Sequence, residues 1–265
     1  LVSSTYRRHT QFDWYSFDEW LDSGLGITQL AWRSGHLAGV MSASQPMNAT
    51  TWIRAICLSE STNEAEVIAA LWQSIHPILR DKGAVSCWLA ALEPWVEAHT
   101  AQMGMARSEM LIAMRREANK ALPPAPAVDV TLEAGSLESV SVLAAIDHAA
   151  FAPPFQLSHP DIRRAYRVST TCTVAKLGDE IVGFQISSRH GKVGHLARLA
   201  VLPHYQGRGI GAALVREMIA AFLRRQVEVI TVNTQLSNTR SQELYQAYGF
   251  ERTRYDTPMF SVSLT

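Results

Sequence analysis

The hydrophobic pattern of the C-terminal half alternates between strand-like and helix-like periods. Residues Leu196 to Leu202 form an apolar run of the length of a buried strand. From Ile210 to Phe222, apolar residues recur every four positions and predict an amphipathic helix of about four turns. The β-branched residues between Val227 and Val232 predict a second buried strand. This order of elements predicts an α/β domain.

The N-terminal half shows the same order of patterns. Residues Thr28 to Trp32 and Leu37 to Ala43 predict a β-hairpin. A buried strand at Trp52 to Leu58, a helix at Ala65 to Arg80 and a strand at Ala84 to Ala90 are predicted to follow. Equivalent positions in the two halves are about 144 residues apart, which suggests a tandem duplication.

A proline-rich segment separates the two halves. Residues 122–127 read Leu-Pro-Pro-Ala-Pro-Ala, and prolines at this density disfavour a helix and favour an extended spacer. We therefore predict one domain at residues 1–120, a linker at 121–127 and a second domain at 128–265. The chain has 265 residues, of which 47% are hydrophobic, enough for two cores.

Charge and cysteine content narrow the class of protein. The 24 basic residues balance the 24 acidic residues, so the composition gives no sign of a nucleic-acid partner or an anionic membrane surface. The chain has no run of eighteen apolar residues that would predict a membrane span. Cys57, Cys87 and Cys172 are scattered, which favours reduced thiols in the cytoplasm over a disulfide framework or a metal site.

A glycine-rich segment joins the predicted strand to the predicted helix at Gln206-Gly207-Arg208-Gly209-Ile210-Gly211. Such a turn presents free backbone N–H groups at the positive end of the helix dipole, where a phosphate can bind. The segment lacks the Lys-Ser or Lys-Thr pair of a P-loop, and its glycine spacing differs by one residue from the dinucleotide-binding fingerprint. A coenzyme A pyrophosphate site and a purely structural turn are the remaining interpretations.

A second motif lies about 30 residues downstream. It consists of Asn238, Leu244, Tyr245, and the pair Gly249 and Phe250. Together with the glycine-rich segment, this motif resembles the GNAT superfamily of acyl-CoA-dependent N-acyltransferases, over about residues 128 to 262. The resemblance implies two tandem GNAT-like α/β domains, each a mostly antiparallel twisted sheet flanked by helices. The layout is similar to that of mycothiol synthase, with the active site in the C-terminal half.

The resemblance implies acetyl-CoA as the co-substrate and no metal. The strand before the loop would supply backbone donors to the thioester carbonyl and would pair with the pantetheine arm. Tyr245 would protonate the leaving thiolate. Arg208, Arg224 and Arg225 are expected to reach the CoA phosphates. The residues implied in acetyl-CoA binding are Leu199, Ala200, Val201, Gln206, Gly207, Arg208, Gly209, Ile210, Gly211, Ala212 and Asn238.

The base that would deprotonate the amine is a less direct inference. His195 stands where many members of the family carry a glutamate, and a structural histidine is the alternative. It lies roughly 13 Å along the strand from Leu199, so it would act through water. In the ribosomal-protein N-terminal acetyltransferases a glutamate precedes the motif asparagine by five residues, but here that position is Asn233. Arg198 could hold an anionic substrate group or form a salt bridge.

The N-terminal half does not repeat this chemistry. Residues 59–65, at the place of the loop, contain no glycine, and Glu60 and Glu64 would repel a pyrophosphate. Ser61 and Thr62 instead suit a helix cap. We therefore expect a degenerate, non-catalytic domain that provides packing and one wall of the acceptor cleft.

The sequence thus predicts an N-acetyltransferase that moves an acetyl group from acetyl-CoA to a primary amine by direct attack. A small-molecule acceptor is the first expectation, with the protein a monomer or a homodimer. A protein N-terminal or lysine acetyltransferase is one alternative. A non-catalytic acyl-CoA-binding module is another.

Overall fold

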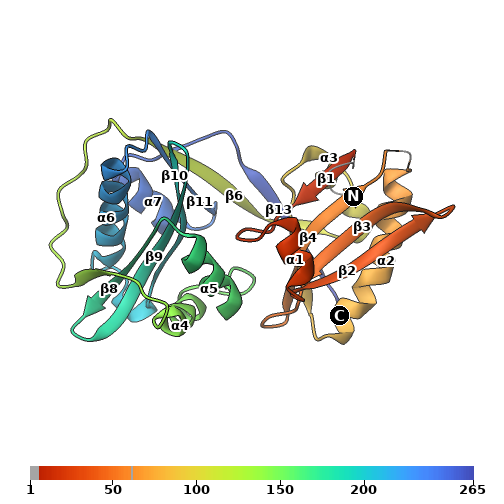
Figure 1. Cartoon of the computed structure of the whole chain (residues 1–265), viewed down its shortest axis with the longest axis horizontal. Helices are drawn as coiled ribbons and strands as arrows, with labels where there is room; N and C mark the ends of the chain where they lie inside the picture. Colours follow the sequence, from red (N-terminus) through yellow and green to blue (C-terminus); the bar gives the residue numbers. More distant parts are fainter. Residues whose placement is uncertain (1–5, 61) are drawn as a thin grey trace. The chain divides into compact units, whose positions relative to one another are not determined.

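The computed structural model describes residues 6–60 and 62–265 of the chain. The chain divides into two compact units, each a mixed β-sheet flanked by helices (Figure 1). Unit 1 comprises Leu1–Met110 and Thr257–Thr265, and unit 2 comprises Leu111–Asp256. The predicted fold class is therefore confirmed.

Unit 1 is built on the predicted hairpin, strand, helix and strand. Its elements are β1 (Arg7–Thr10), α1 (Phe17–Asp22), β2 (Gly26–Arg33), β3 (His36–Ser44), β4 (Thr50–Leu58), α2 (Glu64–Asp81), β5 (Ser86–Ala90), α3 (Pro94–Glu97), the 3-10 turn η1 (Ala101–Met103) and β13 (Thr257–Ser263).

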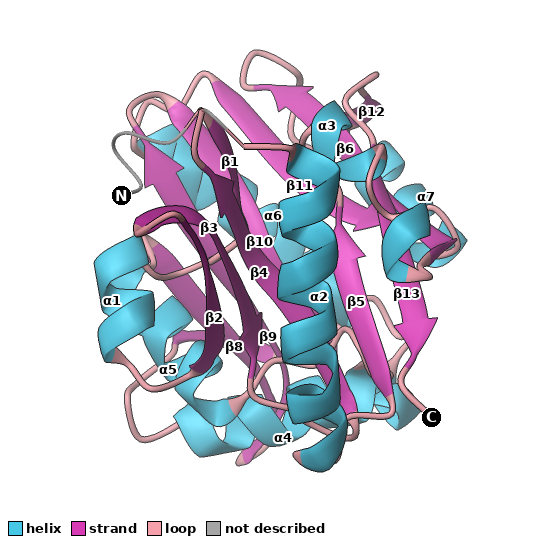
Figure 2. Cartoon of the chain, turned by 90° about the vertical axis from the view of Figure 1, so that its right-hand side faces the viewer, coloured by secondary structure: helices cyan, strands magenta, loops and turns pink. Residues whose placement is uncertain are grey.

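The sheet of unit 1 has the strand order β2-β3-β4-β5-β13. Strands β4 and β5 are parallel, and the other pairs are antiparallel. Helix α2 lies across one face of this sheet (Figure 2). Its apolar side, including Ile68 and Leu71, packs on Ile53, Ile56 and Leu58 of β4, all fully buried. This cluster is the core of unit 1.

Unit 2 repeats the same order of elements. They are β6 (Ala106–Glu117), which belongs to this unit from Leu111 onward, β7 (Thr131–Ala134), α4 (Val140–Ala150), α5 (His159–Val168), β8 (Thr171–Leu177), β9 (Glu180–His190), β10 (Val193–Val201), η2 (Pro203–Tyr205), α6 (Ile210–Arg224), β11 (Val229–Gln235), α7 (Thr239–Ala247) and β12 (Glu251–Arg252).

The sheet of unit 2 has the order β6-β11-β10-β9-β8-β7, with β12 beside β6. Strands β10 and β11 are parallel, and the other pairs are antiparallel. Leu199 and Val201 pack on the cluster that contains Ile210 and Leu214 of α6. Successive residues of a strand face opposite sides, so Arg198 and Ala200 face the other side of the sheet, toward α4.

The boundary between the units differs from the one that the proline-rich segment suggested. Residues 122–127 contain no helix or strand, but they lie inside unit 2, where Arg216 donates a hydrogen bond to the carbonyl of Pro123. Strand β13, at the end of the chain, belongs to unit 1, because it pairs along Met259 to Ser263 with β5. Strand pairing, rather than the position of the prolines, sets the division.

Two corresponding strands carry a β-bulge at the same place. In β4 the register with β3 shifts at Arg54, and in β10 the register with β9 shifts at Ala197. A bulge leaves one extra residue on its strand and increases the local twist. Counting from the bulge, Ile56 to Leu58 of β4 correspond to Leu199 to Val201 of β10. The two units are thus related in detail.

Caps fix the start of the two helices that the sequence motifs mark. Asn63 caps α2, and its side chain accepts a hydrogen bond from the Glu66 N–H. Ser61, which was predicted to contribute to this cap, lies outside the described residues. Asn238 caps α7 by accepting a hydrogen bond from the Ser241 N–H at 3.1 Å.

The three cysteines are unpaired, with Cys57 and Cys87 buried and Cys172 half-buried. Burial raises the pKa of the Cys87 thiol to about 12. Among residues 6–60 and 62–265, no helix has the length and apolar character needed to span a membrane.

Candidate functional site

Strands β10 and β11 run side by side over only part of their length. Their parallel register extends from Val193 to Leu196, although β10 continues to Val201. The bulge at Ala197 lies where the register with β11 ends, and a bulge increases the twist of its strand locally. The edge of β10 from Leu199 to Val201, called the open edge below, therefore presents backbone N–H and C=O groups beyond the register with β11.

The glycine-rich segment follows the open edge directly. Gly207 and Gly209 have φ values of +83° and +84°, which residues with a side chain rarely adopt. Gln206 ties the segment down, since its amide nitrogen donates to the Val201 carbonyl at 3.0 Å. Its amide oxygen accepts from Arg240 of α7 at 2.9 Å. The segment is thus held between the open edge and α7.

The start of α6 suits an anion. Its first turn, Ile210 to Ala213, consists of uncharged residues, so the N–H groups and the helix dipole act without a competing carboxylate. Arg208 lies beside it, with its guanidinium 5.2 Å from the centre of the Tyr205 ring. The prediction for Arg224 and Arg225 was wrong, because they stand at the other end of α6, about 20 Å away along the helix axis.

Helix α7 brings the second motif close to the glycine-rich segment. A Cβ atom added at Gly211 would lie 3.5 Å from the side chain of Leu244, the residue before Tyr245. Tyr245 is buried, with 5% of its surface exposed, and its ring packs on Phe250. Burial raises the pKa of Tyr245, and the positive charge of Arg198 partly offsets this effect. Tyr245 therefore keeps its proton at neutral pH.

His195 lies on the part of β10 that is still paired with β11. Its Nδ1 is 2.9 Å from the hydroxyl of Thr231, which itself donates to the Gly194 carbonyl. In the tautomer where the Thr231 hydroxyl donates to the Gly194 carbonyl, Nδ1 carries the hydrogen, and Nε2 of the neutral ring is left to accept a proton. Burial, together with the charge of His190, lowers the pKa of His195. The ring is therefore neutral at pH 7, and its position is four residues from the open edge.

Arg198 forms a salt bridge, which was one of the two predicted alternatives. Its Nε lies 2.5 Å from a carboxylate oxygen of Asp147, a residue of α4 that is fully buried. The same guanidinium donates to the Phe155 carbonyl at 2.6 Å and stacks 3.6 Å from the centre of the Phe151 ring. Arg198 thus anchors the loop between α4 and α5 to the face of β10 opposite α6.

The sequence motifs did not identify several residues that hold this region together. Arg240 follows the motif asparagine by two residues, and this position was the only signal in the sequence. In the folded chain its guanidinium bonds to Gln206 of the glycine-rich segment. Arg116 is fully buried, and its guanidinium donates to the carbonyls of Tyr248, Lys120 and Ala121. Arg116 precedes Tyr248 by more than 130 residues, so no local pattern could pair it with the end of α7.

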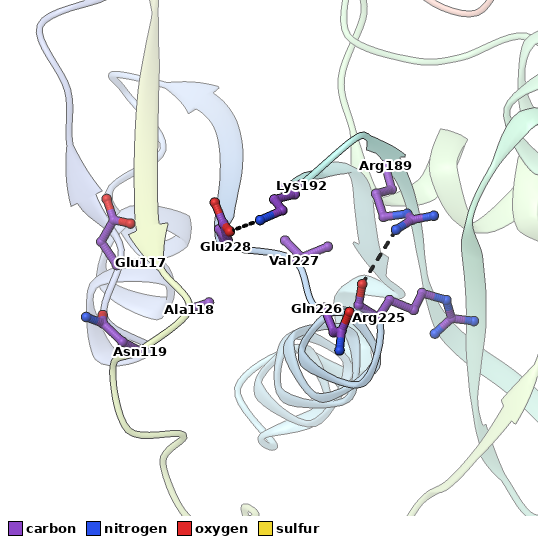
Figure 3. A pocket seen from close by; sticks show the side chains of 9 residues that line it. All are labelled: Glu117, Ala118, Asn119, Arg189, Lys192, Arg225, Gln226, Val227 and Glu228. Atoms are coloured by element: carbon purple, nitrogen blue, oxygen red, sulfur yellow. Dashed lines mark hydrogen bonds and ion pairs between the residues drawn. The ribbon is translucent and has the colours of Figure 1, made fainter.

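A hollow of about 750 Å³ lies at the other end of α6 (Figure 3). It is formed where β9 turns into β10 and where α6 ends, and within it Lys192 pairs with Glu228. Of the residues predicted for the site, only Arg225, which was expected to reach the CoA phosphates, lines it. The lining residues are Glu117, Ala118, Asn119, Arg189, Lys192, Arg225, Gln226, Val227 and Glu228. In the described part of the chain, no group of three or more His, Cys, Asp or Glu side chains is arranged to hold a metal ion.

Comparison with known proteins places this geometry in context. Residues 141–250 match the family described as Acetyltransferase (GNAT) family. The chain is 33% identical over 86 residues to N-alpha-acetyltransferase 30 of Xenopus laevis, a match that covers 31% of this chain and 32% of that protein. It is also 33% identical over 81 residues to N-alpha-acetyltransferase MAK3 of Arabidopsis thaliana, covering 31% and 38%. The chain spans about a third of the length of these curated relatives.

Solved structures of similar fold extend over both units. A GCN5-related N-acetyltransferase from Sphaerobacter thermophilus matches 94% of this chain and 86% of its own, with a TM-score of 0.64 and 16% identity. A tandem GNAT protein from the clavulanic acid biosynthesis pathway matches 90% and 84%, with a TM-score of 0.62 and 15% identity. At these identities the likeness is one of fold. It includes a protein with two such domains in tandem.

Proposed function

The second unit carries a GNAT-family acetyltransferase domain, and from this premise we propose that the chain is an acetyl-CoA-dependent N-acetyltransferase with its active site in unit 2. The observation that carries the proposal is the open edge of β10, which lies between the end of the β11 register and the glycine-rich start of α6. Leu199 to Val201 offer backbone hydrogen bonds to an extended ligand, and the helix start offers N–H groups to a phosphate. A pantetheine arm that ends in a pyrophosphate has both features.

The residues of unit 2 fit this ligand. Gly207 and Gly209 bring the backbone close to a phosphate without a side chain between them. A Cβ atom at Gly209 would meet Pro126 and Val128 at an ordinary contact distance of 3.8 Å, so it is the positive φ that favours glycine here. Arg208 and Arg240 add positive charge beside the helix start, where a phosphate would lie. Bound acetyl-CoA would supply the thioester, whose acyl group moves to an amine.

Two residues would move protons. Tyr245 keeps its proton at neutral pH, so its hydroxyl can donate that proton to a thiolate that leaves. The neutral His195 can accept the proton of the attacking amine at Nε2, through water, because it lies four residues along β10 from Leu199. The N–H groups of the open edge would meet the negative charge that develops on the thioester oxygen.

Calorimetric titration of the full chain with acetyl-CoA, together with the rate of CoA thiol release in the presence of amines, tests this proposal. We expect binding at micromolar concentration and amine-dependent release of the thiol. The absence of binding at millimolar acetyl-CoA would disprove the proposal. Binding without transfer to any amine would instead support an acyl-CoA-binding module.

For the acceptor, we propose the primary amine of a small molecule. On the face of β10 that carries Ala200, the Arg198–Asp147 salt bridge and the Phe151 ring stacked on Arg198 cover the surface next to Ala200. Because the two charges are paired and buried, this surface leaves room for a compact substrate rather than an extended one. A panel of small amines, compared by kcat/KM, would identify the class.

A second candidate acceptor is the α-amino group of a protein. The 33% identity to N-alpha-acetyltransferase 30 and MAK3 favours it. Asn233 weighs against it, since an amide cannot act as a base where the ribosomal-protein N-terminal acetyltransferases are expected to carry a glutamate. Peptides with free and blocked N-termini, offered at equal concentration with the small amines, would distinguish the two candidates.

A further inference from the structure

The strand edge in unit 1 that corresponds to the open edge is occupied by the chain itself. Strand β4 pairs with β5 only from Thr50 to Trp52, as β10 pairs with β11 only over its first residues. Beyond the bulge, β1 pairs antiparallel with β4 from Ala55 to Leu58 (Figure 2). Ile56, Cys57 and Leu58, the counterparts of Leu199 to Val201, lie opposite His9, Arg8 and Arg7.

Strand β1 pairs with the edge of β4 through backbone hydrogen bonds, as a strand added from outside would. Just beyond β1, the Gln11 N–H donates to the Arg54 carbonyl at 2.7 Å. In an antiparallel pair such bonds recur at every second residue, so the N–H groups of His9 and Arg7 point toward β4 and that of Thr10 points away. A peptide strand can therefore satisfy the edge of β4 along its backbone.

The start of the following helix holds the second recognition element. Arg7 lies one residue pair from His9 on the same face of β1, and its Nε is 2.8 Å from a carboxylate oxygen of Glu64, the first residue of α2. His99 lies 3.3 Å from the other carboxylate oxygen, and the Trp95 ring centre is 6.0 Å from the Arg7 guanidinium. The start of α2 in unit 1 thus binds the cationic side chain of Arg7, whereas the corresponding start of α6 in unit 2 suits an anion.

We propose that unit 1 uses this edge of β4 as a peptide-binding site, and that its ligand is residues 7–11 of the same chain. The site takes an extended strand through the backbone of β4. It selects a basic residue through Glu64 and a buried ring at the position of His9, which is 1% exposed. The inference rests on the proposed function only in using the open edge of unit 2 for comparison.

The proposal can be tested by cutting the chain in the turn after β1. The cut is made after folding, so that β1 is present while unit 1 folds. A protease site is inserted between Asp13 and Trp14, and the full chain is folded and then cut. All seven tryptophans lie in unit 1, between Trp14 and Trp95, so their fluorescence reports on this unit alone. We expect the cut fragment to stay bound under native conditions and to exchange with a labelled synthetic peptide of residues 6–13.

Peptides with altered backbone or side chain define what is recognised. N-methylation of Gln11, which removes the bond to Arg54, should weaken peptide binding at least tenfold, whereas N-methylation of Thr10 should change it less than threefold. Replacement of Arg7 by Glu in the peptide should also weaken binding at least tenfold, because it places a carboxylate against Glu64. Equal affinity of all four peptides, or no exchange at all, would overturn the proposal.

Acetyl-CoA titration of the same cut protein separates this proposal from the function of unit 2. We expect one acetyl-CoA per chain whether or not the strand has been removed. If a second acetyl-CoA binds once the strand has been removed, the peptide site is overturned. The edge of β4 would then be an acetyl-CoA site that β1 covers. Loss of acetyl-CoA binding with peptide exchange intact would contradict the proposed function alone.

Discussion

Units 1 and 2 present the same strand edge after the same bulge, but within the described part of the chain only unit 1 pairs a strand with it. In unit 2 the open edge is followed by Gly207 and Gly209 and by a helix start without charged side chains. In unit 1 the corresponding helix start carries Glu64, which binds Arg7 of β1. The difference teaches that the fold supplies a place for an extended ligand, while the first turn of the next helix decides its charge.

The largest effect should come from Tyr245, which has no tyrosine counterpart in unit 1. Tyr245→Phe removes the hydroxyl that would protonate the thiolate, and we expect kcat to fall by about 10²-fold or more. The affinity for acetyl-CoA should stay nearly unchanged. Tyr248→Phe, in a buried tyrosine near the end of the same helix, is the matched control and should retain turnover. Equal turnover of Tyr245→Phe and the wild type would exclude Tyr245 as the acid.

A carboxylate in the first turn of α6, as in the first turn of α2, should remove the preference of α6 for an anion. The third residue of α2 is Glu66, and the third residue of α6 is Ala212. Ala212→Glu places a carboxylate about 6 Å from a bound phosphate, which costs about 3 kcal/mol at an effective dielectric constant of ~20. We therefore expect acetyl-CoA to bind ~100-fold more weakly by calorimetry.

Ala212→Gln separates charge from size in that experiment. The amide has the same shape as the carboxylate without its charge, so the affinity should change less than about threefold. If both variants bind acetyl-CoA equally weakly, steric exclusion rather than charge sets the difference between the two helix starts.

The filled edge should make the stability of unit 1 depend on pH. Among residues 6–60 and 62–265, neither ring nitrogen of His9 has a hydrogen-bond partner, and burial lowers the pKa of His9 from 6.5 to about 4. Because the folded pKa lies below the unfolded value, stability is fully present above pH 6.5 and is lost as pH falls toward 4. The loss should reach about 3 kcal/mol in the free energy of unfolding.

Urea unfolding followed by tryptophan fluorescence at pH 7.5 and pH 5 measures the part of this loss that occurs above pH 5, about 2 kcal/mol in the free energy of unfolding of unit 1. His9→Phe keeps a buried ring without a titrating group, so its unfolding free energy should differ less between the two pH values. The exposed His36→Phe is the control and should behave as the wild type. A pH dependence that persists undiminished in His9→Phe would assign the effect to another group.

The smallest effect concerns His195 in unit 2. Since its pKa is lowered, His195 can accept a proton down to a pH below ~6.5, and kcat/KM should fall as pH drops through that pKa. His195→Ala should be about tenfold slower near neutral pH and should approach the wild type at high pH, where the amine loses its proton unaided. An unchanged pH profile of kcat/KM in the variant would leave His195 a structural role.

Local patterns predicted the hairpin of unit 1, the central strands and the helices α2 and α6, because their apolar periods are long and regular. The sequence did not predict β1, whose residues Arg7 to Thr10 lack an apolar alternation and become a strand only by pairing with β4. It likewise did not assign β13 to unit 1, since its partner β5 lies some 170 residues earlier. Pairing over such separations leaves no local mark.

The candidate site follows the same rule. The glycine-rich segment and the second motif could be located by spacing alone, and in the structure the motif residue Asn238 caps α7. The contacts of Arg198 with Asp147 and of Arg240 with Gln206 join different elements, so they required the folded chain. Arg224 and Arg225 are separated from the glycine-rich segment by the whole length of α6.

The place of β13 has a consequence for synthesis on the ribosome. Unit 2 is a continuous stretch, Leu111–Asp256, whereas unit 1 needs Thr257–Thr265 beside β5. The part of unit 1 that precedes unit 2 therefore cannot complete its sheet until the nascent chain has been made through Ser263. A chain that stops between Asp256 and Thr257 would contain all of unit 2 but would leave the edge of β5 exposed to aggregation.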